Sequence, residues 1–220
     1  IKFIIIHYTG MKKESEAIKR LCDSESQVSS HYFIKDNGEI LNLVPDLYEA
    51  WHAGKSSWKN FKSINKNSIG IEVNNPGHDH VYKKFYSKQI ISLIKLLRFL
   101  KKRYNIKIKN ILGHSDIAPL RKKDPGEKFP WNKLAKKNLC KFHSLNERKI
   151  KIYRNLKLES YENKKFLTNL HKIGYSDINK ANTNKSRELI IKAFQRRYRQ
   201  DLINGKPDKE CLLISKNLTN

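Results

Sequence analysis

Two histidines and an aspartate occupy positions where a metal site could form. His7 follows the apolar run 3–6, and His114 follows the run 111–113. Asp124 comes ten residues after His114, inside a Pro-Gly loop that would hold a carboxylate still. Two imidazoles and one carboxylate on rigid supports are typical of a catalytic zinc site, whose fourth position stays open to water. Hydrogen-bonded core histidines with a turn aspartate are the alternative that spacing alone leaves open.

Glu72 is the candidate for proton transfer. It lies near the end of the strand-like pattern 68–73, between apolar neighbours. A carboxylate beside a metal-activated water can take its proton and pass it to a leaving amine, provided that the surroundings tune its pKa. A glutamate on an edge strand that simply faces solvent is the alternative.

The elements that would position these residues alternate between strand and helix over residues 1–143. The turn Asp36-Asn37-Gly38 is typical of a hairpin between two strands. Ser87 is expected to cap a long amphipathic helix that runs through Tyr104. Five strands, flanking helices and one antiparallel hairpin predict an α/β fold with a mixed central β-sheet. The expected strands are 3–7, 32–35, 39–44, 68–73 and 110–114, and the expected helices are 13–22 and 87–104.

The chain after residue 143 follows a different pattern. The segment 144–160 is charged and without periodicity, which predicts a linker. Apolar residues at helical spacing then predict three helices, which would form a small domain near the lower size limit for independent folding. The expected organisation is a catalytic domain at 1–143, a linker at 144–160 and a three-helix domain at 161–220.

The composition excludes several classes of protein. An apolar content of 38% with 10% aromatic residues is typical of a globular chain, and no apolar run reaches the roughly 18 residues of a transmembrane helix. Cys22, Cys140 and Cys211 are far apart and odd in number, which excludes a disulfide scaffold, and we expect all three to be buried. Because the chain opens inside a strand without Met, we expect a native N-terminus that has been cut back.

The formal net charge of +25 raises the question of a nucleic-acid partner. Of the 46 basic residues, 36 are Lys, and they are spread along the chain without an Arg-rich stripe. We therefore expect no specific nucleic acid. So basic a chain is nevertheless drawn to polyanions, including anionic cell-wall polymers and acidic membrane surfaces.

Five strings of the sequence together resemble one family. They occur in the family's order and keep its step of ten residues from the second histidine to the aspartate. The chain is similar in them to the zinc-dependent N-acetylmuramoyl-L-alanine amidases of the amidase-2 type, which are related to the peptidoglycan recognition proteins. The likeness covers about residues 1–143. The strings are IIIHYTG (4–10), SSHYFIKDNGEI (29–40), WHAG (51–54), INKNSIGIEVNN (64–75) and GHSDIAPLRKKDPGEKFPW (113–131).

The resemblance implies one Zn²⁺ per catalytic domain, held by His7, His114 and Asp124. It makes Glu72 the catalytic acid and base, and it makes Lys122 the cation that stabilises the oxyanion. The implied reaction is hydrolysis of the amide bond between N-acetylmuramic acid, in its plain or 1,6-anhydro form, and L-alanine of the peptidoglycan stem peptide. A non-catalytic protein that binds or senses peptidoglycan is the alternative.

The resemblance also implies a set of positions at the substrate groove. One departure from the family pattern concerns the arginine that many relatives carry nine residues before the glutamate. Here that position is Ser63, preceded by Lys62. A lysine supplies charge without the bidentate fork of an arginine, so the stem-peptide preference stays open. The implied substrate-binding residues are His52, Tyr8, His31, Asn74, Trp58, Ile117 and Ala118.

The C-terminal residues resemble a three-helix peptidoglycan-binding module. The likeness lies in FLTNLHKIGYS (166–176) and IIKAFQRRYR (190–199). A helical cap that stiffens the catalytic domain is the alternative. We expect a monomer that acts on peptidoglycan or muropeptides in the bacterial cell envelope or periplasm, with recycling in the cytoplasm as the alternative.

Overall fold

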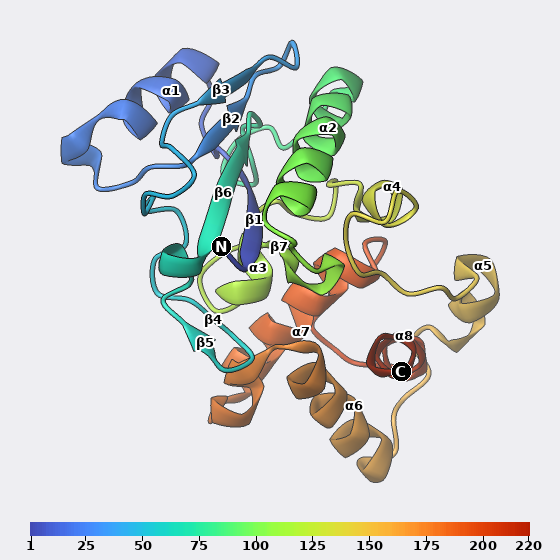
Figure 1. Ribbon diagram of the computed structural model, residues 1–220. Helices are drawn as coiled ribbons and strands as arrows, with labels where there is room; N and C mark the ends of the chain where they lie inside the picture. Colours follow the sequence, from blue (N-terminus) through green and yellow to red (C-terminus); the bar gives the residue numbers. More distant parts are fainter.

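A five-stranded sheet in the order β3-β2-β6-β1-β7 lies at the centre of the protein (Figure 1). The computed structural model describes residues 1–220, apart from the side chain of Lys180. Strands β2, β6, β1 and β7 are parallel, and β3 pairs antiparallel with β2. The prediction of a mixed sheet with one hairpin is therefore confirmed. The strands are β1 (Phe3–Tyr8), β2 (Tyr32–Ile34), β3 (Ile40–Asn42), β6 (Ser68–Val73) and β7 (Ile111–Gly113).

The long helix α2 (Ser87–Arg103) covers one face of the sheet. Side chains alternate along a strand, so Ile4 and Ile6 of β1 point to this face and join an apolar cluster with Leu93 and Leu97 of the helix. The helix begins one residue earlier than a cap at Ser87 predicts. Tyr86 is the capping residue, because its backbone N–H donates to the side chain of Gln89 at 2.9 Å.

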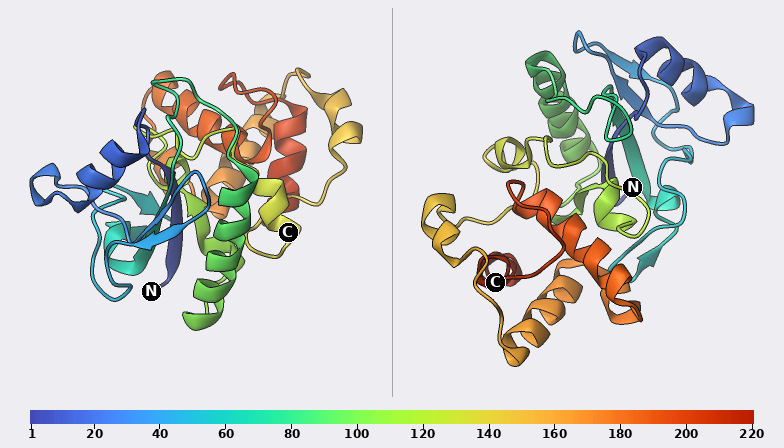
Figure 2. Two further views of the ribbon diagram at one scale, coloured as in Figure 1. Left: turned by 90° about the horizontal axis from the view of Figure 1, so that it is seen from above. Right: turned by 180° about the vertical axis from the view of Figure 1, so that it is seen from behind.

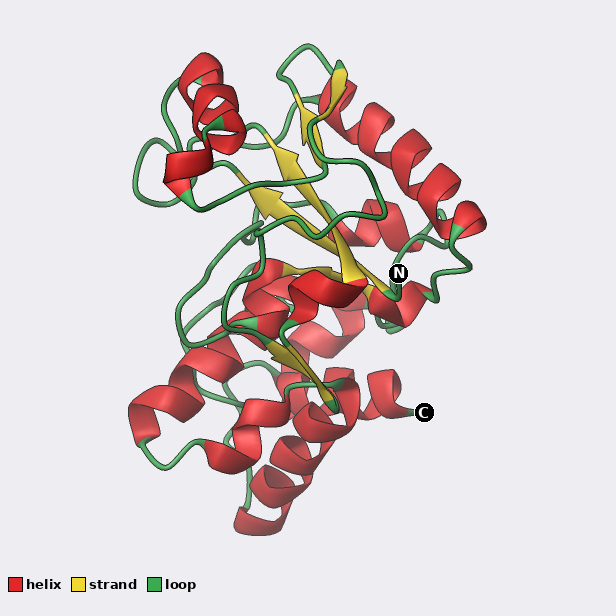
Figure 3. Ribbon diagram, turned by 60° about the vertical axis from the view of Figure 1, so that its left-hand side comes forward, coloured by secondary structure: helices red, strands yellow, loops and turns green.

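The C-terminal helices cover the opposite face, below the sheet in Figure 3 and at the lower left in the right view of Figure 2. They are α6 (Ser160–Ile173), α7 (Asn184–Tyr198) and α8 (Lys209–Thr219). Phe3 and Ile5 of β1 belong to the same apolar cluster as Phe166 of α6 and Phe194 of α7. Residues on both sides of the predicted linker thus contribute to one core. The folding of 161–220 as a separate domain stays a prediction.

Several short helices and strands could not be predicted from the sequence, because segments of two to five residues are too short to show a periodic spacing of apolar residues. The predicted strand 110–114 is shorter than expected, since His114 already begins a helical turn, α3. Cys22 is exposed, whereas Cys140 and Cys211 are buried as expected. Within the described residues, no helix has the length and apolar character needed to cross a membrane. The other elements are α1 (Glu14–Cys22), η1 (Ser24–Ser26), β4 (Ser57–Trp58), β5 (Phe61–Lys62), η2 (Ile64–Asn67), η3 (Ile108–Asn110), α3 (His114–Ile117), α4 (Trp131–Ala135), α5 (Glu147–Ile150), η4 (Lys151–Tyr153) and η5 (Ser176–Lys180).

A buried ion pair ties α7 to the turn α3. Arg197 of α7 donates from Nη1 to Oδ2 of Asp116 at 2.5 Å, and both side chains are almost fully shielded from water. The hydroxyl of Tyr175 donates to the other oxygen of Asp116 at 2.8 Å. Because Asp116 comes two residues after His114, the far end of the chain helps to fix the turn that carries this histidine.

We predict that Arg197→Met lowers the free energy of unfolding by about 3–5 kcal/mol, because the charge of Asp116 then stays buried without its partner. Urea denaturation of the full chain would measure the loss. Arg187→Met, at an exposed position of the same helix, is the matched control and should stay within about 0.5 kcal/mol of the parent. Equal losses in both variants would contradict a bracing role for the pair.

Candidate metal centre

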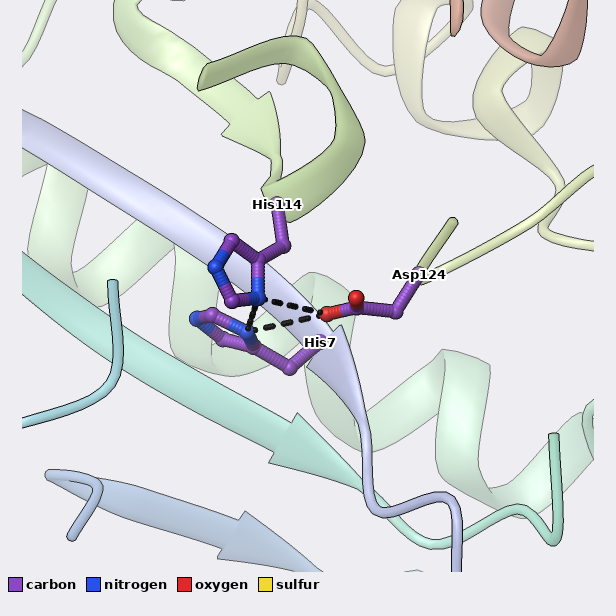
Figure 4. Close-up of side chains that lie close together, drawn as sticks. All are labelled: His7, His114 and Asp124. Atoms are coloured by element: carbon purple, nitrogen blue, oxygen red, sulfur yellow. Dashed lines mark hydrogen bonds and ion pairs between the residues drawn. The ribbon is translucent and has the colours of Figure 1, made fainter. Parts of the chain in front are cut away.

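Three donor atoms from distant parts of the chain converge at one edge of the sheet (Figure 4). His7 lies near the carboxyl end of β1, His114 directly follows β7, and Asp124 lies on the loop after α3. The two Nδ1 atoms are 3.0 Å apart, and each lies 3.0 Å from Oδ2 of Asp124. The ligands of a tetrahedral ion with bonds of 2.0–2.1 Å lie about 3.3 Å from one another. All three side chains are buried, so the cluster has the ligand number and spacing of a metal site.

Two groups approach the outer nitrogen of His114: the guanidinium of Arg121, which can only donate, lies 3.4 Å from Nε2, and a backbone carbonyl lies closer, so the shorter contact favours a hydrogen on Nε2. This nitrogen lies 3.2 Å from the carbonyl oxygen of Ala53, which can only accept. In a neutral ring Nε2 is then the donor, and Nδ1 turns a lone pair toward Asp124. A lone pair and a carboxylate oxygen at 3.0 Å repel each other unless a cation lies between them. The donor chemistry therefore fits a bound metal ion.

A relay of hydrogen bonds fixes the hydrogen of His7 on its outer nitrogen. The hydroxyl of Ser68 donates to the carbonyl of Ile64 at 2.8 Å, so its oxygen accepts from Nε2 of His52 at 3.1 Å. Nδ1 of His52 is then an acceptor and takes the hydrogen on Nε2 of His7, at 3.1 Å. His7 is thereby left with a lone pair on Nδ1, directed at the cluster. Gly70 makes room for this relay, since a Cβ there would lie 2.4 Å from Cγ of His52.

Glu72 faces the same cleft as the three donors. It is paired with His7 in the parallel register of β1 and β6, so both side chains lie on one face. Its Oε2 atom is shielded from water and has no hydrogen-bond partner. Burial raises the pKa of Glu72 to about 8, the charge of Asp124 adds to this, and Lys122 opposes it. The carboxyl group is therefore free to gain and lose a proton near neutral pH.

The cleft in front of these residues has a volume of about 480 Å³ and a basic wall. Lys122 and Lys123 line it next to Asp124, and Arg20 of α1 lines it as well. Trp51, with 54% of its surface exposed, lies at the rim. The remaining lining residues are Tyr8, Thr9, Gly10, Met11, Ala17, Leu21, Val28, Ser29, His52, Asp79 and Arg121.

The predicted substrate-binding residues separate into two groups. Tyr8 and His52 line the cleft, and His52 lies behind His7. The other five do not line it, and all five side chains are buried within the fold. The two ring nitrogens of His31 contact the carbonyl of Tyr48 and the N–H of Gly70, both at 3.0 Å.

Asn74, Trp58, Ile117 and Ala118 complete that second group. The amide of Asn74 donates to Asp36 at 2.9 Å. Trp58 and Ile117 belong to the apolar cluster shared with the C-terminal helices, and Ala118 is buried as well. None of these four residues lines the cleft.

No functional role was predicted from the sequence for Arg121 or His78. The guanidinium of Arg121 donates to the carbonyls of Ala53 and Lys55, and so fixes the loop that satisfies His114. Only its place inside the string 113–131 hinted at a role. His78 is partly buried and links the hydroxyl of Tyr8 at 2.9 Å to the carboxylate of Glu127 at 3.0 Å.

Comparison with known proteins identifies the family. The family described as N-acetylmuramoyl-L-alanine amidase matches residues 1–127. N-acetylmuramoyl-L-alanine amidase AmiD of Escherichia coli K12 is 35% identical over 99% of this chain and 82% of its own. The chain therefore belongs to the N-acetylmuramoyl-L-alanine amidases, and the predicted amidase activity is confirmed at this level.

Solved structures extend the likeness to the whole chain. The complex of AmiD from E. coli with anhydro-N-acetylmuramic acid-L-Ala-D-γ-Glu-L-Lys has a TM-score of 0.86 and covers 99% of this chain and 88% of its own. AmpDh3 of Pseudomonas aeruginosa, 28% identical, also has a TM-score of 0.86, with 99% and 91% covered. By contrast, the 1,6-anhydro-N-acetylmuramyl-L-alanine amidase AmpD of E. coli K12, 41% identical, matches 48% of this chain and 55% of its own. The C-terminal helices are thus shared with the first two proteins.

The raised pKa of Glu72 predicts a pH-dependent stability difference between the metal-free protein and its Glu72→Gln variant. The folded state holds this proton up to about pH 8, whereas the unfolded chain releases it near its ordinary pKa of 4.5. Stability from this group is therefore complete at low pH and is lost as the pH rises from 4.5 to 8, by at most about 1.4 kcal/mol per pH unit. The free energy of unfolding of Glu72→Gln, relative to that of the parent, should therefore increase over this range.

Urea titrations of both proteins with a chelator would measure this. The difference between the two curves isolates Glu72, because His7, whose pKa burial and then His114 lower to about 4, contributes equally to both. A difference that stays constant with pH would contradict the assignment.

The relay behind His7 predicts that His52→Ala weakens zinc binding by about 10- to 100-fold, since the hydrogen on Nε2 of His7 loses its acceptor. His52→Asn should recover most of the affinity, because its Oδ1 can accept from His7. Competition with a chromophoric chelator would give both values. Unchanged affinity in His52→Ala would show that the relay does not orient the ligand.

Proposed function

We propose that this protein is a zinc-dependent amidase whose metal is held by His7, His114 and Asp124. The observation that carries the proposal is the convergence of their three donor atoms at 3.0 Å, in the cleft that Glu72 also lines. The bond cleaved joins the lactyl group of N-acetylmuramic acid to L-alanine. A protein that only bound the cell wall would have no use for a carboxylate without a structural partner beside three metal-ligand atoms.

The roles of the residues follow from their chemistry. Zinc, when bound, acts as a Lewis acid toward a carbonyl oxygen and makes a water molecule more acidic. Glu72 accepts the proton of the attacking water and returns it to the departing amine of alanine, for which a pKa raised to about 8 in the metal-free protein is suitable. Lys122, on the wall of the cleft, supplies positive charge for the developing oxyanion.

Muropeptides with an anhydro-muramic end are the substrates that we infer. The two relatives of matching length were solved with such molecules, AmiD with an anhydro-muramyl tripeptide and AmpDh3 with an anhydromuramic pentapeptide. The basic wall of the cleft suits the carboxylates of a stem peptide, and Arg20 or Lys123 could take the part of the arginine that Ser63 replaces.

We also propose that the helices of 161–220 support binding to the polymer and that the protein acts in the cell envelope. The resemblance of these helices to a peptidoglycan-binding module supports the first part. The net charge of +25, which attracts anionic wall polymers, supports the second.

The acid and base role predicts that Glu72→Gln lowers turnover of an anhydro-muramyl tripeptide by at least about 10²-fold while zinc stays bound. Mass spectrometry of the products and elemental analysis of the protein would measure the two quantities separately. Asp124→Ala should lose both the turnover and the bound zinc. Substantial turnover in Glu72→Gln would contradict the role of this residue.

The oxyanion role predicts that Lys122→Met lowers kcat by about 10²–10³-fold with zinc content unchanged. Lys123→Met, which removes the neighbouring charge, is the matched control and should alter kcat far less. Equal losses would mean that the cleft needs its overall positive charge rather than this ammonium group.

A further inference from the structure

A smaller cavity lies between the β4–β5 hairpin, η3 and the C-terminal helices, and it shares no lining residue with the cleft of the metal centre. Its volume is about 50 Å³. Five cations from five separate segments line it, and among the residues that the structure describes no Asp or Glu does so. We call it the basic cavity. Its cations are Lys59 between β4 and β5, Lys109 of η3, Lys141 after α4, Lys172 of α6 and Arg197 of α7, and its other lining residues are Trp58, Ile173, Tyr198 and Leu218.

The cations of the basic cavity are close enough to affect one another. Partial burial lowers the pKa of Lys59 below its ordinary value, and the charges of Lys109 and Lys141 lower it further. Lys141 donates to the carbonyl of Leu218 at 2.5 Å, and Arg197 is paired with Asp116, so two of the five cations already have a partner in the fold. Gathering like charges around a hollow is unfavourable, and an anion in the hollow would remove the cost.

Two buried N–H groups of the lining residues have no acceptor. They are Nε1 of Trp58 and Nε of Arg197, whose side chains are almost entirely shielded from water. The other nitrogens of Arg197 are engaged with Asp116 and with backbone carbonyls. The indole of Trp58 packs closely against Gly174, where a Cβ would lie 2.3 Å from its Cε2 atom. Buried donors without partners are rare and costly in folded proteins.

We propose that the basic cavity binds a phosphate group. A tetrahedral dianion offers acceptors in several directions at once, which suits ammonium, guanidinium and indole donors arriving from separate segments. The small volume favours a single oxyanion over a sugar or a peptide. The same chemistry is presented by free inorganic phosphate and by the phosphomonoester headgroup of a lipid, so the experiment must distinguish these sources.

The test is calorimetric titration of the full-length, zinc-loaded protein with inorganic phosphate at fixed ionic strength. We expect saturable binding that falls by about tenfold or more in the double variant Lys59→Glu, Lys172→Glu, because each position is exposed and turns from attraction to repulsion. The matched control is Lys95→Glu, Lys102→Glu on α2, which has the same net charge and should keep its affinity within about twofold. Amidase turnover should be the same in all three proteins.

Trp58→Phe tests the indole donor by itself. It should weaken phosphate binding several-fold, and thermal unfolding without phosphate would show that the variant is folded. Absence of saturable binding in the parent, or an equal loss in the control, would overturn the proposal.

A second titration, with phosphatidylcholine vesicles that contain phosphatidic acid, identifies the source. Binding that inorganic phosphate displaces and that the Lys59→Glu, Lys172→Glu variant lacks assigns the cavity to a lipid phosphate. Binding of the free ion alone assigns it to inorganic phosphate.

Discussion

Three electron-pair donors held 3.0 Å apart are the constraint on which the rest of this structure depends. Without a cation they repel one another, so the fold must supply the contacts that keep them together. A carbonyl holds the outer nitrogen of His114, and the relay through His52 holds that of His7. The backbone carbonyl of Asp124 accepts from the N–H of Ser115 at 2.8 Å. The site is thus organised by contacts outside the cluster itself.

These outer contacts also explain why the C-terminal helices matter to a site that they do not line. Asp116 occupies the turn that begins with His114, and its carboxylate is satisfied by Tyr175 and Arg197. Removing the helices would therefore expose the apolar face of β1 and leave a buried carboxylate without its cation. The C-terminal helices can therefore stabilise the catalytic region whether or not they also bind the polymer.

The sequence predicted best those parts of the fold whose signal is local. The strand 68–73, the hairpin turn at 36–38 and the helix from 87 have clear periodicity or turn chemistry, and all three are present. The core shared between β1 and the C-terminal helices joins residues more than 150 positions apart, which no periodicity reports. A family string marks the neighbourhood of a site without showing which way each side chain faces. Trp58 and His31 lie within or near such strings, yet both side chains are buried inside the fold and away from the cleft.

The two carboxylates of the cleft show how one environment assigns two roles. Burial by itself would raise the pKa of Asp124. In the metal-free protein, where hydrogen on Nδ1 of the two rings takes the place of the cation, the charge and hydrogen bonds of His114, followed by those of His7, outweigh burial and hold this pKa well below its usual range. Glu72 has no such partner, and burial raises its pKa to about 8. Pairs of acids whose pKa values are driven apart commonly divide the work of a reaction. Asp124, which stays ionised, is suited to hold a cation, and Glu72, which can exchange a proton at neutral pH, is suited to move one.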